Sequence, residues 1–388
     1  MSMEGCKAAR FGIGILVAIV VFGLAPANAV EKSGAASSEK STAWPVFRGN
    51  ATGDGIALSQ LPEELEVMWE FQAEDSSFAA TAVIENGIVY VGDADNYFYA
   101  IDLETGAKLW SHQVEIGFIA SPAIQAGRVF VGDSNGTFYC FDARSGDVIW
   151  KHQSDAEINS SANFYKDSVL VGSQDGSLYR FRTKDGSIVW KYTIEASGGI
   201  QCSPTLADKL AFVCGCDGKL HVIDVDEGST VETIEIGDPT LSTPAVAGDN
   251  VYFGTEGANV YGVDWRTAKV VWTYQNQQRR VSYRSSAAVT KELVIIGGRN
   301  KSVEAVKRDS GELAWSFPTG GRIDSSPVVV GNRIFVGSAD GRLYQLDLQT
   351  GDSTWSHDAG AGFEASPAVA ENRLVIGNRA GVLFCFGQ

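Results

Sequence analysis

Histidine, cysteine and proline are scarce in this sequence, and the short motifs of several enzyme classes are missing. The chain of 388 residues has 4 His, 6 Cys and 10 Pro. It has no Gly-Lys-Ser/Thr phosphate loop, and its one Gly-x-Ser-x-Gly match, GDSNG (132–136), ends in a predicted hairpin turn rather than in the strand-to-helix turn of a nucleophile elbow. His112, His152 and His357 each stand two residues after a Trp, in separate parts of the chain, and His221 stands alone. We therefore expect no catalytic residues of these classes and no metal site.

Positive charge is also in short supply. The 31 Lys and Arg residues are outnumbered by 47 Asp and Glu residues, which gives a formal net charge of −16. A surface this acidic repels phosphate polymers and anionic lipids. The composition therefore argues against nucleic acid as a partner.

Long apolar runs are absent except near the amino terminus. Lys7 and Arg10 precede fourteen uncharged residues, 11–24, and an Ala-x-Ala step ends at Ala29. These are the parts of a secretory signal peptide, which we assign to residues 1–29. The run is shorter than the roughly 20 residues that cross a bilayer, so we expect no membrane span after cleavage, with an uncleaved anchor as the alternative. The protein is then exported, to the periplasm or out of the cell.

The segment after the signal peptide, residues 30–43, is rich in Ser and Ala and is interpreted as a flexible linker. Cleavage would remove Glu4, Lys7 and Arg10 and take the net charge from −16 to −17. No Cys directly follows the cleavage step to carry a lipid. Any association with the outer membrane is therefore expected to depend on partner proteins.

The most informative feature of the sequence is a repeat. The segment AIDLETGAKLW (100–110) returns as CFDARSGDVIW, RFRTKDGSIVW, GVDWRTAKVVW, AVKRDSGELAW and QLDLQTGDSTW, and a weaker copy ends in Glu232 instead of Trp. The ends of successive copies are 40 to 43 residues apart. That period is typical of propeller blades and of two-helix solenoid repeats.

Short β-rich runs decide between these two architectures. Each unit has a small-Ser-Pro-like step, an apolar run such as VFVG (129–132), an Asp-Gly-like turn and a second run such as FYCFD (138–142). Runs of this length, bounded by Gly, Asn and Asp, are typical of β-hairpins, and no helical stripe follows the signal peptide. Each unit is therefore predicted to be a four-stranded antiparallel blade.

The two ends of the chain complete the last blade. The unit that starts at Phe363 stops after three strands, whereas a lone EVMWEFQ (66–72) places Trp69 41 residues ahead of Trp110. Pairing of these N- and C-terminal strands leaves no open edge. The sequence thus predicts an all-β, eight-bladed β-propeller over residues 66–388.

An N-terminal leader, residues 44–65, precedes the propeller. It contains WPVFRGNATGDG (44–55), whose Asn and Asp residues lack the carboxylate pattern of a calcium loop. We expect a turn-rich segment that covers one face of the propeller.

The repeat resembles that of the PQQ-like (quinoprotein-type) β-propellers, a family that includes quinoprotein alcohol dehydrogenases and BamB-like barrel-assembly lipoproteins. In that family the Trp packs between adjacent blades, and the Asp and Thr-Gly form the turn that docks it. The resemblance implies these blade-docking roles for Trp69, Asp102, Thr105, Gly106, Trp110, Asp142, Gly146, Trp150, Gly186, Trp190, Trp272, Gly311, Trp315, Asp347, Thr350, Gly351 and Trp355. The repeat would then serve packing rather than catalysis.

Five cysteines would remain after signal cleavage, and an odd number cannot all pair within one chain. Cys140 and Cys385 hold the same strand position two blades apart, which is too far for a bridge. Cys202, Cys214 and Cys216 share one predicted hairpin. For these three, a disulfide and free thiols both stay open.

The funnel at the ring centre is the candidate site. In each blade we expect one side chain to face the funnel. It belongs to the residue two positions before the Ser of the small-Ser-Pro step, or before the residue that replaces this Ser. These residues are Phe78, Ile119, Asn159, Gln201, Leu241, Arg284, Asp324 and Glu364. The last three form either structural ion pairs or an arc that recognises a partner. Beside them, the basic loop QNQQRRVSYR (275–284) carries residue types enriched in interface anchors, with a solvated face as the alternative. The candidate partner-binding residues are Arg279, Arg280, Tyr283, Arg284, Asp324 and Glu364.

Three functions are compatible with this sequence. We favour an exported, monomeric, non-catalytic scaffold that binds cell-envelope proteins, is BamB-like, and needs no cofactor; outer-membrane protein assembly is one such role. The resemblance also implies a dehydrogenase holding pyrroloquinoline quinone and Ca²⁺ against adjacent cysteines, for which the nearest match is Cys214-Gly215-Cys216. The third function is a binder of small molecules or polysaccharides. Aromatic side chains near the blade starts would support it, although packing at the rim also explains them: Phe78, Phe118, Tyr283 and Phe363.

Overall fold

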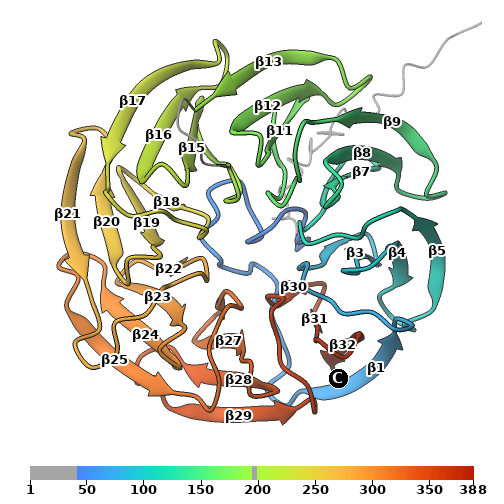
Figure 1. Cartoon of the computed structure of the whole chain (residues 1–388). Coiled ribbons are helices and arrows are strands. Elements are labelled where there is room, and N and C mark those ends of the chain that lie inside the picture. Colours follow the sequence, from blue (N-terminus) through green and yellow to red (C-terminus); the bar gives the residue numbers. More distant parts are fainter. Residues whose placement is uncertain (1–41, 195–198) are drawn as a thin grey trace, which may run out of the picture. The chain divides into compact units, whose positions relative to one another are not determined.

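The structure is a computed structural model that describes residues 42–194 and 199–388. The signal peptide assigned to residues 1–29 and most of the linker lie outside the described residues. Thirty-two strands form eight separate four-stranded antiparallel sheets around a common centre (Figure 1). This confirms the all-β, eight-bladed propeller. In the described part of the chain, no helix has the length and apolar character needed to span a membrane.

Each of the first seven blades is built from four consecutive strands, ordered from the ring centre outward. Blade 1 comprises β2 (Val83–Glu85), β3 (Ile88–Gly92), β4 (Tyr97–Asp102) and β5 (Lys108–Gln113). Blade 2 comprises β6 (Ala123–Gln125), β7 (Arg128–Gly132), β8 (Thr137–Asp142) and β9 (Val148–Gln153). Blade 3 comprises β10 (Asn163–Tyr165), β11 (Ser168–Gly172), β12 (Ser177–Arg182) and β13 (Ile188–Thr193). Blade 4 comprises β14 (Thr205–Ala207), β15 (Leu210–Cys214), β16 (Lys219–Asp224) and β17 (Ser229–Glu235).

The second half of the ring repeats this order. Blade 5 comprises β18 (Ala245–Ala247), β19 (Asn250–Gly254), β20 (Val260–Asp264) and β21 (Lys269–Tyr274). Blade 6 comprises β22 (Ala288–Val289), β23 (Leu293–Gly298), β24 (Ser302–Lys307) and β25 (Leu313–Pro318). Blade 7 comprises β26 (Val328–Val330), β27 (Arg333–Gly337), β28 (Arg342–Asp347) and β29 (Ser353–Asp358). Blade 8 comprises β30 (Ala368–Ala370), β31 (Arg373–Gly377), β32 (Val382–Gly387) and, from the other end of the chain, β1 (Glu66–Gln72).

Blade 8 closes the ring as the sequence predicts. Strand β1 pairs antiparallel with β32, and Trp69 lies opposite Cys385 in the register. The two segments are more than 300 residues apart in sequence but share one sheet (Figure 1). Because this pairing uses the free edge of β32, the two ends of the propeller are held together.

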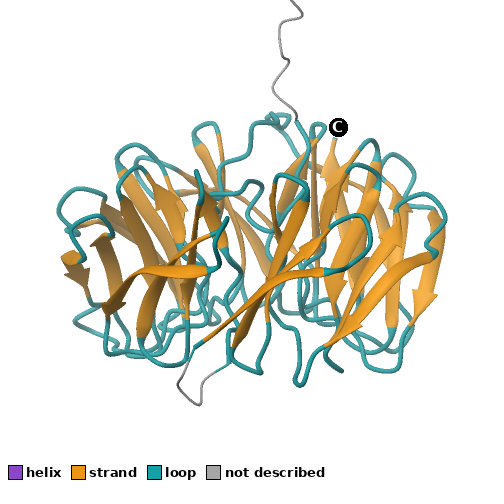
Figure 2. Cartoon of the chain, turned by 90° about the horizontal axis from the view of Figure 1, so that it is seen from above, coloured by secondary structure: helices purple, strands orange, loops and turns teal. Residues whose placement is uncertain are grey.

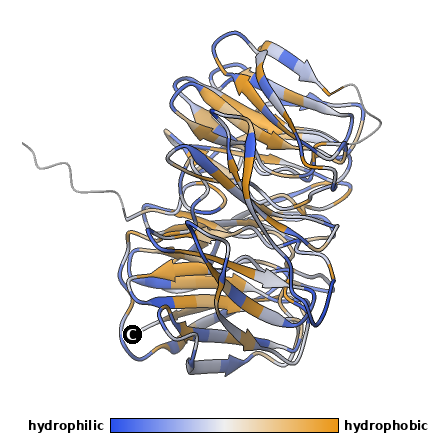
Figure 3. Cartoon of the chain, turned by 90° about the vertical axis from the view of Figure 1, so that its left-hand side faces the viewer, coloured by the Kyte–Doolittle hydropathy of each residue, from blue (hydrophilic) through white to orange (hydrophobic). Residues whose placement is uncertain are grey.

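The strands run between two faces of the ring (Figure 2). One face carries the loops from the outer strand of each blade to the inner strand of the next, and we call it the mouth face. The other carries the turns between the third and fourth strands, where the repeated Asp lies, and we call it the turn face. The inner strands of the blades are mostly hydrophobic (Figure 3), and strands such as β3 and β4 are buried. Outer strands such as β5 alternate between exposed and half-buried residues. The core therefore lies between blades.

The repeated Trp joins each blade to the next. Trp110 of blade 1 donates a hydrogen bond from Nε1 to the Ala143 carbonyl of blade 2 at 3.0 Å and packs against Gly146. The same bond recurs at 2.8–3.1 Å from Trp69, Trp150, Trp190, Trp272 and Trp315. Trp355 instead packs edge-to-face against Phe386 at 5.7 Å. An indole buries a large apolar area and anchors its N–H on a fixed acceptor, which fixes the spacing of blades.

The turn that receives the Trp is shaped by its Asp. The Asp102 carboxylate accepts hydrogen bonds from the Thr105 hydroxyl at 2.7 Å and the Thr105 amide at 2.8 Å. These bonds hold the pKa of Asp102 below its ordinary value of 3.8. The pKa values of Asp142 and Asp347 are lowered in the same way, by the amides of Ser145 and Thr350.

The seam between blades 4 and 5 departs from this pattern. Glu232 stands where the other outer strands have Trp, and the turn of blade 5 supplies Trp265 instead. Trp265 packs edge-to-face on Phe212 of blade 4, with ring centroids 5.5 Å apart. An aromatic side chain is thus supplied from the opposite side of the seam.

The leader lies inside the ring (Figure 1). Trp44 exchanges two backbone hydrogen bonds with Ile84 of blade 1, and from there the leader contacts each later blade in turn. The carbonyls of residues 45, 51, 52, 54 and 55 accept from the inner strands of blades 2, 4, 5, 6 and 7, the Asn163 amide of blade 3 donates to residue 51, and Ser59 Oγ accepts from blade 8. The leader therefore blocks the channel and bonds to all eight blades.

The tight fit between turn and Trp gives a testable prediction. Gly146 and Gly127 have φ near +76° and +72°, so replacing either with Ala costs about 1 kcal/mol from the left-handed backbone. A Cβ at Gly146 would lie 2.6 Å from the Trp110 ring, whereas a Cβ at Gly127 meets nothing within 4 Å. We expect Gly146→Ala to lose about 1–3 kcal/mol more stability than Gly127→Ala in urea unfolding. Equal losses would show that the Trp110 contact does not constrain the turn.

Candidate functional site

A blind funnel lies at the ring centre, open on the mouth face. Its cavity of about 140 Å³ is lined by Phe47 of the leader and by two residues from each blade. One residue of each pair forms a wider ring at the mouth, and the other forms a narrower ring, the neck. The leader closes the far end, so the funnel is a pocket rather than a pore.

The neck is a ring of eight hydroxyl groups, one from each blade. The backbone N–H of each of these residues donates to the hydroxyl of the corresponding residue in the next blade, at 2.9–3.0 Å. The circle closes when Ser366 of blade 8 donates to Thr81 of blade 1. The eight residues are Thr81, Ser121, Ser161, Ser203, Thr243, Ser286, Ser326 and Ser366. This is why the small-Ser-Pro step recurs.

Arg48 of the leader lies behind the neck and is almost completely buried, at 1% exposure. Its Nη2 donates to the carbonyls of Ala287 and Pro327, at 3.1 and 2.6 Å, and its Nε and Nη1 have no partner among the described residues. Burial lowers the pKa of Arg48 to about 9, and the charge of Asp54 acts against this shift. The guanidinium therefore stays charged at neutral pH.

The mouth ring agrees with the residues expected from sequence in seven blades out of eight. Blade 1 contributes Ala79, not Phe78, which is fully buried. The prediction for blade 1 is wrong by one residue, because Thr81 and not Ala80 takes the place of the Ser and forms the neck of that blade. Phe118, Tyr283 and Phe363 are also buried, so none of the four aromatic residues is available at the mouth to stack on a ligand.

Arg284, Asp324 and Glu364 all line the mouth, but each is paired with another charge. Arg284 donates to both carboxylate oxygens of Glu256, at 2.7 and 3.1 Å. Asp324 accepts two bonds from Arg299, at 2.7 and 3.0 Å, and one from Arg322, at 2.9 Å. Glu364 lies 3.3 Å from Arg322 and 3.7 Å from Arg379. The charged arc is therefore a network of ion pairs that connects blades 5 to 8.

Sequence reasoning missed the partners in this network. The missed partners share one position in the repeat, two residues after a Gly at the end of the second strand. They are Glu256, Arg299 and Arg379. That position lies in the turn between the second and third strands of each blade, on the mouth face and beside the mouth ring. Aligning it across the repeats would have found these three residues.

The basic loop 275–284 lies on the mouth face, between β21 and β22. Arg279 and Arg280 are exposed, together with Val281. Tyr283 is not part of this surface, because its ring is buried and its hydroxyl donates to the buried Glu304 at 2.6 Å. The loop thus presents two arginines and one apolar residue to solvent.

The cysteines of the described residues are all free, so no disulfide joins Cys202, Cys214 and Cys216. The Cys202 thiol donates to the Cys214 carbonyl at 2.8 Å and accepts from its amide at 3.2 Å. Burial raises the pKa of Cys202 to about 12. Cys202 therefore acts as a buried, uncharged packing residue.

The histidines on outer strands pack between blades. His112 and His152 lie about 4.9 Å from Phe141 and Phe181 of the following blade, measured between ring centroids, and His357 lies 5.0 Å from Phe386. Burial lowers the pKa of all three imidazoles. No group of three or more potential metal ligands occurs among the residues described.

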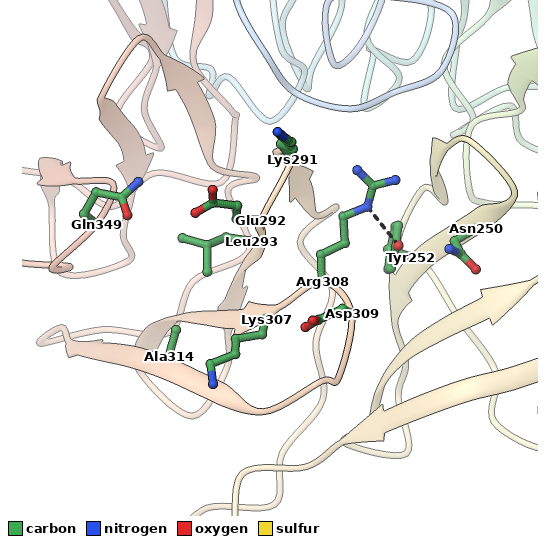
Figure 4. Close-up of a pocket in the computed structure, with 10 residues that line it drawn as sticks. All are labelled: Asn250, Tyr252, Lys291, Glu292, Leu293, Lys307, Arg308, Asp309, Ala314 and Gln349. Carbon is green, nitrogen blue, oxygen red and sulfur yellow. Dashed lines mark hydrogen bonds between the residues drawn. The ribbon is translucent and has the colours of Figure 1, made fainter.

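Among the larger hollows that lie away from the funnel, two are on the turn face. One, of about 530 Å³, is lined by residues of blades 5 to 7, and in it Arg308 reaches across to the Tyr252 hydroxyl at 3.0 Å (Figure 4). The other, of about 480 Å³, lies between blades 8 and 1. Hollows that recur at corresponding seams reflect the blade geometry, so we do not take them for dedicated sites.

The sequence profile of the family described as outer membrane protein assembly factor BamB matches residues 62–203, 196–316 and 299–385. The chain belongs to this family. The expected resemblance to PQQ-like propellers is thereby confirmed.

Relatives of two kinds share parts of this sequence. Outer membrane protein assembly factor BamB of Shewanella oneidensis is 25% identical over 144 residues, which is 34% of this chain and 36% of that protein. Quinoprotein alcohol dehydrogenase PedH of Pseudomonas putida is 26% identical over 142 residues, which is 32% of this chain and 24% of that protein. The chain thus spans about a third and about a quarter of the length of these two relatives.

Solved structures of both kinds share the fold. BamB of Moraxella catarrhalis has a TM-score of 0.70 and 20% identity, covering 84% of this chain and 98% of that one. Quinohemoprotein alcohol dehydrogenase of Comamonas testosteroni has a TM-score of 0.76 and 14% identity, covering 89% and 81%. At these identities the likeness concerns the fold alone.

The funnel residues do not fit the quinone and cation that some relatives of the fold imply. A cavity of 140 Å³ is below the roughly 300–1,000 Å³ of organic ligand pockets. The mouth carboxylates Asp324 and Glu364 already bind arginines, which leaves neither free to hold a cation. Cys214, the nearest match to a cofactor-facing cysteine, is buried at the end of β15.

The charged arc gives a prediction with a defined pH dependence. Burial raises the pKa of Asp324, but bonds from Arg299 and Arg322 outweigh it and leave that pKa below 3.8. The stabilisation from the carboxylate is then present above the unfolded pKa and is lost as pH falls through the folded pKa. Asp324→Asn should cost about 1–3 kcal/mol at pH 7, because Arg299 loses its charged partner and Arg322 keeps only Glu364.

Urea unfolding at a series of pH values measures this effect. The difference between wild type and Asp324→Asn should shrink below pH 3.8, where the wild-type carboxylate becomes protonated. Asp155→Asn, at an exposed carboxylate between β9 and β10, is the control and should change little. A constant difference across this range would contradict the ion-pair assignment.

Proposed function

We propose that this chain is an exported, non-catalytic propeller that binds a protein of the cell envelope through its mouth face, in the manner of a BamB-like scaffold. Membership of the BamB family supports this role, and outer-membrane protein assembly is the process that the family description suggests. The signal-peptide pattern supports export, and the net charge of −16 argues against nucleic acid. We expect a monomer with no cofactor, associated with the outer membrane through its partners.

The observation that carries the proposal is the loop between β21 and β22. It has 13 residues, whereas the other connections from one blade to the next have 9 to 11. Its Arg279 and Arg280 are exposed, on a protein that is otherwise acidic. Loops on a rigid ring are common places for recognition, and Arg is enriched among residues that anchor interfaces.

An apolar area on the opposite side of the mouth complements this loop. Ile116 and Ile119, in the loop between blades 1 and 2, are 45% and 48% exposed. Blades 1 and 2 lie across the ring from blades 5 and 6 (Figure 1). A partner segment that spans the mouth would contact apolar side chains on one side and arginines on the other, which favours a segment with both apolar and acidic residues.

Pull-down from the native envelope tests this role. Arg279→Ala combined with Arg280→Ala should change the free energy of unfolding by less than about 0.5 kcal/mol, because both side chains are exposed. Recovery of the partner should fall at least about tenfold, as expected for loss of interface anchors.

A matched control removes the same number of positive charges from the turn face instead of the mouth face. Arg144→Ala combined with Lys184→Ala alters two exposed residues in turns of the turn face. This variant should recover the partner as well as wild type does. Equal recovery by both double variants would remove the loop from the binding surface.

A quinoprotein dehydrogenase is a second candidate, favoured by the sequence match to PedH. Mixing the purified protein with pyrroloquinoline quinone and Ca²⁺ distinguishes the two functions. Stoichiometric uptake, seen by ultraviolet-visible absorption, would favour the enzyme, and quinone that stays free would favour the scaffold.

A further inference from the structure

The neck of the funnel has hydrogen-bond donors that the protein does not use. Each of its eight hydroxyl oxygens accepts an N–H, but none of the hydroxyl hydrogens has an acceptor among the described residues. The eight residues are only 3–7% exposed. Buried polar hydrogens are nearly always satisfied, so something in the cavity should accept from them.

The geometry of the circle decides where these hydrogens point. Each hydroxyl oxygen meets a neighbouring blade's amide on the side of the ring wall, and all eight residues line the cavity. No two ring hydroxyls are linked to each other by a hydrogen bond in the described structure, so the ring does not satisfy itself. Its free donors are therefore left to face the axis of the funnel.

A buried positive charge lies directly behind this ring. Arg48 Nη2 binds the carbonyls of Ala287 and Pro327, which are the residues next to Ser286 and Ser326 of the neck. The guanidinium forms no ion pair within hydrogen-bond distance, and two of its nitrogens are buried and unpartnered. The charge of Asp54 offsets part of the cost of burying Arg48, and an anion at the neck would offset more of it.

The surroundings of the neck are also less acidic than the rest of the protein. In the mouth network four arginines face three carboxylates, against a net charge of −16 for the whole chain. The free carboxamide oxygen of Asn159 is an acceptor at the mouth, above the neck. The charged side chains that line the mouth, Arg284, Asp324 and Glu364, include two carboxylates and one guanidinium, so the excess of hydrogen-bond donors lies deeper, at the neck and at Arg48 behind it.

We propose that the neck binds a small monovalent anion, a halide or a small carboxylate, held by the ring hydroxyls with Arg48 as the counter-charge. The cavity of 140 Å³ holds about four or five water molecules, which suits an ion with a few waters. This site is independent of the proposed protein-binding loop, since Arg279 and Arg280 do not line it.

Bromide is the probe, because its anomalous scattering identifies it in crystals and its binding can be titrated in solution by thermal shift at constant ionic strength. Crystals of the mature protein soaked in bromide should show an anomalous peak in the neck, within hydrogen-bond distance of the ring hydroxyls. A neck that holds only water after soaking overturns the proposal.

Two variants test the residues. Ser286→Ala combined with Ser326→Ala removes the ring hydroxyls beside Arg48, and Arg48→Gln removes the charge while leaving the ring complete. Each should weaken bromide binding at least about tenfold, as loss of charge-assisted hydrogen bonds predicts. If the serine variant does not fold, Arg48→Gln alone still decides the outcome.

The adjacent serines supply the matched control. Ser285 and Ser325 are buried too, but their hydroxyls bond to Gly297 and Gly337 within their own blades and not toward the funnel. Ser285→Ala combined with Ser325→Ala should leave bromide affinity within about twofold of wild type. Equal affinities in all variants would contradict the assignment of the anion to the neck.

Discussion

A closed circle of eight hydrogen bonds, from the backbone of each blade to a hydroxyl of the next, holds the centre of this propeller. Because Ser366 of blade 8 donates to Thr81 of blade 1, the circle closes only when β1 and β32 have brought the two chain ends together. The leader strengthens the same constraint, since its backbone bonds to the inner strands at the level just behind the hydroxyls. The hub, the leader and the closing strand therefore depend on one another.

The periphery and the mouth use different means to hold the same blades. Between the outer strands, a Trp of one blade packs on a Gly of the next, and the seam that lacks this Trp is filled by Trp265 from the other side. At the mouth, charged pairs such as Arg299 and Asp324 cross the seams of blades 5 to 8. The arginines of this network are paired with carboxylates, whereas Arg279 and Arg280 of the loop 275–284 are exposed and form no ion pair among the described residues. The loop is therefore the better candidate for a partner surface.

The sequence predicts much of the fold but less of the site. The spacing of the Trp residues sets the number of blades, and the unmatched segment around Trp69 identifies the closing strand, because both are properties of a repeat. Contacts across seams are not periodic in the same way, so the partners Glu256, Arg299 and Arg379 escaped notice. The path of the leader, with Arg48 buried behind the neck, has no counterpart in the repeats. The burial of Tyr283 depends on Glu304, whose position in the third strand is a Tyr or His in most other blades.

Native-state hydrogen exchange tests the central circle most directly. The amides of Thr81, Ser121, Ser161, Ser203, Thr243, Ser286, Ser326 and Ser366 donate the eight bonds, so each should exchange only when the whole propeller unfolds. The account predicts one common free energy of exchange for all eight amides, after correction for their intrinsic exchange rates, equal to the global free energy of unfolding. Faster exchange confined to the amides of blades 8 and 1 would contradict it, because it would show that the ring opens at its closing blade while the remaining blades stay folded.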